Sequence, residues 1–69
     1  MTNTLKLKAV MVERGFTQDD LARRLNISNQ SMNYKINNKR EFKASEIAAL
    51  IRILSITNSN DIFFAEEVS

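Results

Sequence analysis

The chain has 69 residues, enough for one domain with a small core, because a chain this short buries only about 60% of its unfolded surface. It contains no cysteine and no histidine, which excludes disulfides and thiolate chemistry and leaves only carboxylates, without a ligand-like spacing, for a transition-metal site. The net charge is only +2, so a polyanionic partner has to be judged from how the charges are distributed.

These features also narrow the classes of function. Without histidine or cysteine the chain has no nucleophile-base pair, and its single glycine cannot form a phosphate-cradling loop. No segment approaches the ~20 apolar residues of a membrane span, and the start lacks the long apolar run of a signal peptide. We therefore expect a soluble intracellular protein that is not an enzyme and needs no metal, cofactor, membrane or small-molecule ligand.

The first predicted helix spans residues 5–14. Its apolar positions recur at intervals of three and four, and they are Leu7, Val10 and Met11. Thr4 is the expected N-cap, and Gly15 follows a basic residue in the manner of a C′ glycine. Residues 1–3 are expected to be frayed.

A second helix is predicted to begin at Gln18. Thr17 can cap it, and Asp20 completes a capping box three positions later. Its buried stripe consists of Leu21, Ala22 and Leu25. Asn26 ends the helix because asparagine tolerates the left-handed conformation.

A third helix is predicted from Asn29 to Ile36, with Ser28 as its N-cap. Only Met32 and Ile36, four positions apart, are apolar, so we expect one narrow edge to be buried. The outward side then carries mostly amides, namely Asn29, Gln30, Asn33 and Tyr34.

These residues resemble the helix-turn-helix domain of the Cro and lambda-repressor class, particularly small phage regulators. The resemblance covers nearly the whole chain and rests on Gln18, Leu21-Ala22, Leu25-x-Ile27-Ser28, Met32, Ile36 and the ending Lys39-Arg40-x-Phe42-x-x-x-Glu46-Ile47. Asn26 replaces the family's usual turn glycine, and Lys35 stands where a small or apolar residue is common. The resemblance implies an all-α, compact five-helix domain with a short last helix, spanning residues 1–69 with its motif at 18–37.

Positive charge is concentrated on this motif. Residues 23–43 hold six basic side chains and one acidic one, whereas residues 44–69 hold one basic and four acidic side chains. In the family, the loop that follows the third helix lies beside the sugar-phosphate backbone. The loop at 37–41 is therefore either a phosphate contact or simply a solvated turn, and its contact candidates are Asn38, Lys39 and Arg40.

Two further helices are predicted, at residues 44–54 and 61–64. The first has a stripe made of Glu46, Ile47, Leu50, Ile51 and Leu54, and Ile53 lies off this stripe and is expected to be exposed. A turn at 55–60 buries Ile56 and supplies Ser59 or Asn60 as a cap for the last helix. Residues 65–69 form an acidic end that is a candidate for disorder.

The last helix is too short to turn Ile62, Phe63 and Phe64 all inward. We therefore expect an apolar surface formed by Ile53, Phe63 and Phe64, which would serve a homodimer or a partner protein. The alternative is that both phenylalanines merely close a small core.

The side-chain chemistry assigns roles on a duplex. Amides offer one donor and one acceptor, which matches the edge that adenine presents in the major groove. The expected base readers are Gln30, Asn33, Asn29, Ser28 and Tyr34. The expected phosphate contacts are Gln18, which resembles the family's phosphate clamp, together with Lys35, Asn38, Lys39 and Arg40.

The sequence thus predicts a sequence-specific transcriptional regulator that binds a double-stranded DNA operator, similar to a phage Cro-like repressor. If it is phage-encoded, it would act in the cytoplasm of the bacterial host. The alternative is a small helix-turn-helix modulator that binds a partner phage repressor and does not itself hold DNA.

Overall fold

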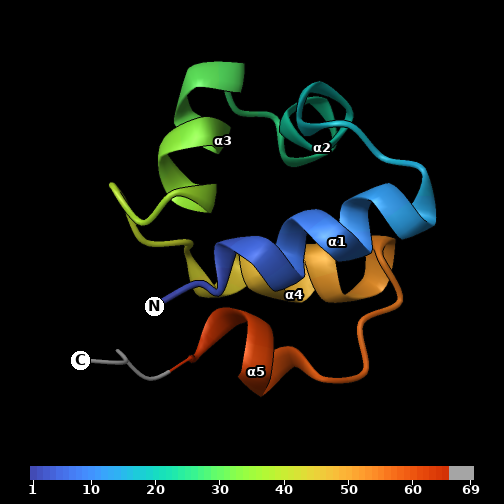
Figure 1. The fold of residues 1–69 in the computed structure, drawn as a ribbon. Coiled ribbons are helices and arrows are strands. Elements are labelled where there is room, and N and C mark those ends of the chain that lie inside the picture. Colours follow the sequence, from blue (N-terminus) through green and yellow to red (C-terminus); the bar gives the residue numbers. More distant parts are fainter. Residues whose placement is uncertain (66–69) are drawn as a thin grey trace.

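The computed structural model describes residues 1–65 of the chain, which contain five helices joined by turns (Figure 1). They are α1 (Thr4–Arg14), α2 (Gln18–Leu25), α3 (Asn29–Ile36), α4 (Ala44–Ile53) and α5 (Ser59–Phe63). This confirms the expected all-α architecture with a short last helix, and no strand occurs in this range. None of the helices here is both long enough and apolar enough to pass through a lipid bilayer.

The helices are arranged so that α2 and α3 lie together on one side of α1, and α5 lies on the other side (Figure 1). The buried core draws on every helix and on the turn before α5. Its members are Leu7, Met11, Leu21, Ala22, Met32, Ile36, Leu50, Leu54, Ile56, Ile62 and Phe63. Helix α3 contributes Met32 and Ile36, both fully buried, as the sequence predicted. One edge of α3 is therefore held in the core while its opposite side faces away from the protein.

Local capping chemistry is as predicted around α2 and α3. The Thr17 side chain accepts a bond from the Asp20 N–H, and the Asp20 carboxylate accepts the Thr17 N–H at 2.8 Å. Ser28 caps α3 by accepting the Ser31 N–H at 3.0 Å. Gly15 and Asn26 have φ angles of 78° and 58°, the left-handed conformation expected after a helix end.

The N-terminal cap of α1 differs from the prediction. Asn3 is the N-cap, because its side chain accepts the Lys6 N–H at 3.1 Å. The Thr4 hydroxyl instead donates to the carbonyl of Ile36 at 2.7 Å. Thr4 therefore ties α1 to the end of α3.

Residues 1–3 are not frayed, contrary to expectation. Long-range bonds hold all three: Asn3 N–H donates to the Ile62 carbonyl, Thr2 exchanges two bonds with the Asn38 side chain, and Met1 exchanges two with the backbone of Ala65. Thr2 is consequently buried. The partners lie far away in the sequence, so composition at the N-terminus carried no sign of them.

The expected apolar surface is only partly present. Phe63 is 4% exposed and packs edge-on against Phe42, with ring centroids 5.7 Å apart. Ile53 is half-buried against the core and not exposed, so both residues leave the proposed surface. Phe64, 60% exposed, is the apolar residue that the short helix leaves outside.

The last two helices also differ in their ends. Helix α4 stops at Ile53, one residue earlier than predicted. Helix α5 begins at Ser59 with Asn58 as its N-cap, and the Asn58 side chain makes no capping bond. The prediction for the acidic end falls mostly on residues 66–69, which lie outside the described residues.

Candidate nucleic-acid interface

The outward side of α3 carries three exposed amide side chains, Asn29, Gln30 and Asn33, which we call the reading face. Its existence follows from the burial of Met32 and Ile36, because those two residues fix the rotation of the helix about its axis. Each amide group has more donor and acceptor positions than its bonds within the protein use, so the remaining positions can pair with a partner. The structure thus brings three of the five predicted base readers to one surface.

The other two predicted base readers are placed differently. Ser28 is exposed, but its hydroxyl oxygen is engaged as the cap of α3. Tyr34 is half-buried, and its hydroxyl accepts a bond from Gln30 Nε2 at 2.9 Å. Tyr34 therefore contacts a reading residue directly.

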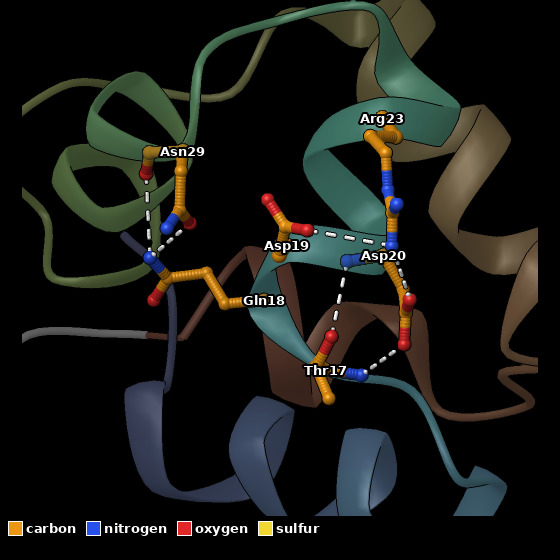
Figure 2. A network of polar contacts seen from close by, with 6 residues as sticks. All are labelled: Thr17, Gln18, Asp19, Asp20, Arg23 and Asn29. Carbon is orange, nitrogen blue, oxygen red and sulfur yellow. Dashed lines mark hydrogen bonds and ion pairs between the residues drawn. The ribbon is translucent and has the colours of Figure 1, made fainter.

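Gln18 joins the start of α2 to the reading face (Figure 2). Its Nε2 donates to Asn29 Oδ1 at 2.8 Å and to the Asn29 carbonyl at 3.3 Å. Its Oε1 accepts from Asn33 Nδ2 at 3.4 Å. The predicted phosphate clamp is thus also a bridge that fixes two reading amides relative to α2.

Helix α2 carries less free positive charge than its sequence suggested. Arg23 lies beside two carboxylates, at 3.3 Å from Asp19 and 2.9 Å from Asp20 (Figure 2). The Thr17 backbone N–H lowers the pKa of Asp20, and the Thr17 side chain and Arg23 add to this effect. Asp20 therefore stays ionised at neutral pH and offsets Arg23 locally.

Lys35 was predicted to send its ammonium toward a phosphate, but the structure directs it inward. The residue is 7% exposed, and its Nζ lies 2.5 Å from Glu46 Oε1. The same carboxylate oxygen accepts the Lys43 N–H at 2.8 Å, which holds Glu46 at the start of α4. Lys35 is consequently a tie between α3 and α4 and no longer a candidate for phosphate contact.

The sequence held a sign of this ion pair. Lys35 follows Met32 by three positions, so it lies on the same side of α3 as that buried residue. Glu46 stands in the apolar stripe of α4. A cation and an anion that both occupy core positions are the expected signature of a buried pair.

The stability of the fold is expected to decrease as the pH falls below about 4.3, the ordinary pKa of a glutamate. Burial raises the pKa of Glu46, but the bonds from Lys35 Nζ and the Lys43 N–H together lower this pKa by more than burial raises it. The net shift of the pKa is therefore downward. A carboxyl group whose pKa is lower in the folded state stabilises that state at pH values above its unfolded-state pKa. This contribution is lost as the pH falls through the folded-state pKa.

Urea unfolding measured from about pH 6 to pH 3 checks this expectation. The variant combining Lys35→Met and Glu46→Gln should lose less stability over this range than the wild type, since its buried site no longer titrates. Asp20 is common to both proteins and so cancels in the comparison. Equal losses in the two proteins would contradict the role given to Glu46.

Residues 37–41, which we call the basic loop, leave α3 beside the reading face. Asn38 adopts a left-handed φ of 62°, and its side-chain amide is spent on Thr2. Its Oδ1 accepts the Thr2 N–H and its Nδ2 donates to the Thr2 carbonyl, both at 2.8 Å. Asn38, predicted to contact phosphate, instead anchors the loop to the N-terminus.

Lys39 and Arg40 are exposed and held close to α3. Their backbone N–H groups donate to the Tyr34 carbonyl at 2.8 and 3.2 Å. The Lys39 Nζ and the Arg40 Cζ lie 5.8 and 5.1 Å from the centre of the Tyr34 ring. These two predicted phosphate contacts therefore lie next to the reading face.

Within residues 1–65, no group of three or more potential metal ligands comes together. Arg24 stacks on Phe16, with its Cζ 5.5 Å from the ring centre. The polar reading face and the two cations of the basic loop are thus the arrangement that best suits an extended anionic partner.

Comparison with known proteins places the chain in a family. No curated protein and no solved structure matched it. One family model, described as "Protein of unknown function (DUF739)", matches residues 3–66. Since this match includes all five helices, the chain belongs to the DUF739 family.

Proposed function

We propose that this protein is a sequence-specific, double-stranded DNA-binding transcriptional regulator that resembles the small phage Cro-like repressors. The observation that carries the proposal is the reading face, three exposed amides on a helix whose opposite edge is locked in the core. Surface helices usually carry charges on their outer side, and an uncharged amide row is suited to base edges.

In this proposal α3 lies in the major groove. An α-helix with its side chains is about 10–12 Å across, which fits a groove about 12 Å wide. The reading face contacts base edges, and Lys39 and Arg40 contact phosphates. Gln18 lies at the start of α2, and the N-terminus of a helix favours a phosphate oxygen.

Regulation would follow from occupancy of an operator, in competition with polymerase or another repressor. Two copies on one operator would place their half-sites about one helical turn apart.

The salt dependence of binding tests the proposal. A plot of the logarithm of the association constant against the logarithm of the salt concentration has a negative slope. Replacing Arg40 by alanine should make this slope shallower by about one unit, because one phosphate contact is lost. Replacing Arg52, an exposed residue of α4, by alanine makes the same change in net charge and should leave the slope unaltered. Fluorescence anisotropy with a duplex selected from a random pool gives both values.

The result that would contradict the proposal is specific. If neither variant changes the slope, or if both change it equally, the basic loop is not at the duplex. If the wild type selects no sequence and shows no salt-dependent binding, the protein does not hold DNA.

A second candidate function is favoured by the surface of α1. Leu5 and Val12 are each 80% exposed, and they stand seven positions apart on one side of the helix. Such a pair suits a protein contact, so the same fold would bind a partner repressor. This alternative is supported if the isolated protein binds no duplex but forms a complex with a repressor encoded beside it. Val12→Lys should then abolish that complex.

A further inference from the structure

One residue of the reading helix connects the base-reading and phosphate-contacting groups. The Tyr34 hydroxyl accepts from Gln30, its ring faces Lys39 and Arg40, and its carbonyl accepts the backbone N–H groups of both. The half-buried side chain of Tyr34 and its backbone carbonyl thus make three kinds of contact. Each of them constrains a group that the proposed function places on DNA.

The bond to the hydroxyl determines how the Gln30 amide faces outward. Nε2 carries two hydrogens, and one is used on Tyr34 at 2.9 Å. The other hydrogen and the Oε1 lone pairs remain for a partner. Gln30 therefore presents one donor and one acceptor side by side.

This pair matches one purine and not the other. Adenine offers the N6 amino group as a donor and N7 as an acceptor, so Oε1 can accept from N6 while Nε2 donates to N7. Guanine offers two acceptors, O6 and N7, and needs two donors. An amide turned the other way, with Oε1 accepting from the tyrosine hydroxyl, would present both hydrogens and suit guanine.

We infer that Tyr34 is a positioning residue that makes Gln30 a reader of adenine in preference to guanine. The inference rests on the proposed function, and it moves Tyr34 from a predicted base contact to a support for one. The Lys39 and Arg40 contacts add to this role, because cations about 5 to 6 Å from the ring centre hold the aromatic side chain in place. A duplex that binds the two cations would thus also fix the ring that orients Gln30.

Tyr34→Phe tests this role, since it removes the hydroxyl and keeps the ring. The wild type should prefer adenine over guanine by about tenfold or more at one position of the selected operator, the range expected for a bidentate contact. Gln30→Ala should abolish this preference and thereby identify the position. Tyr34→Phe should lower the preference severalfold, because the freed amide can turn either way.

The same substitution in a Gln30→Ala background supplies the control. There Tyr34→Phe should leave the base preference at this position unchanged, whereas a merely structural effect would alter binding in both backgrounds. Circular dichroism establishes that each variant is folded. A second measurement uses the wild-type protein alone, with 7-deazaadenine at the identified position, which removes N7 and should reduce affinity about as much as guanine does.

The outcomes separate the inference from the function on which it depends. Guanine preference at the Gln30 position, undiminished adenine preference in Tyr34→Phe, or full affinity for 7-deazaadenine would each overturn the inference while DNA binding stands. A wild type that selects no operator would overturn both. Adenine preference that is lost in Tyr34→Phe only when Gln30 is present supports the inference.

Discussion

Replacing Lys35 by methionine is expected to lower the free energy of unfolding by about 3 kcal/mol. The substitution removes the ammonium and leaves the Glu46 carboxylate, whose side chain is 9% exposed, with the Lys43 N–H as a partner and no opposite charge within bonding distance. An unpaired charge in such a place is costly. A domain of this size has a stability of only a few kcal/mol, so the loss would be a large part of the total.

Urea unfolding followed by circular dichroism measures the effect at neutral pH. The double variant Lys35→Met with Glu46→Gln is the matched control, since it contains no buried charge and the introduced glutamine side chain can still accept the Lys43 N–H. It should recover most of the lost stability. If the double variant is as unstable as the single one, the loss comes from altered packing and the account based on charge fails.

Replacing both Gln30 and Asn33 by alanine is expected to lower the preference for the operator over an unrelated duplex by about 30-fold or more. Each amide that bonds a base with two hydrogen bonds contributes about 1–3 kcal/mol of discrimination, so two such losses give at least about 2 kcal/mol. Binding to the unrelated duplex should change much less, because phosphate contacts supply it.

Competition binding with the two duplexes, at one fixed salt concentration, gives this ratio. Asn60→Ala is the control, because it removes an exposed amide from α5, away from the reading face. It should preserve the ratio. A double variant that still prefers the same operator would show that Gln30 and Asn33 are not the base readers.

The parts of the fold that sequence could predict depend on short-range chemistry. The capping box of Thr17 and Asp20, the Ser28 cap and the left-handed Asn26 each need partners within four positions, and all are present. The same holds for the reading face, which follows from the four-residue spacing of Met32 and Ile36. Such features are encoded by residues that lie close together in the sequence, so a local pattern is enough to predict them.

Several of the differences from expectation involve partners that are distant in sequence. Thr4 was expected to cap α1, but the carbonyl of Ile36, 32 positions away, takes its hydroxyl. Asn38 was expected at a phosphate, but Thr2, 36 positions away, takes its amide. The charge of Lys35 predicted an exposed ammonium, whereas its position on the helix predicted burial. The side chain is buried because Glu46 supplies a partner for its charge. Local patterns cannot show which distant group will satisfy a polar side chain.

The contact between Met1 and Ala65 has a consequence for the order of folding. These residues are 64 positions apart and joined by backbone hydrogen bonds, whereas Gln18 and Asn29 are only 11 apart. Closing the longer loop costs about 1.5 kcal/mol more in chain entropy. Contacts across short loops tend to form first, so the α2–α3 pair should form early on the folding pathway, and the two ends of the described chain should meet late.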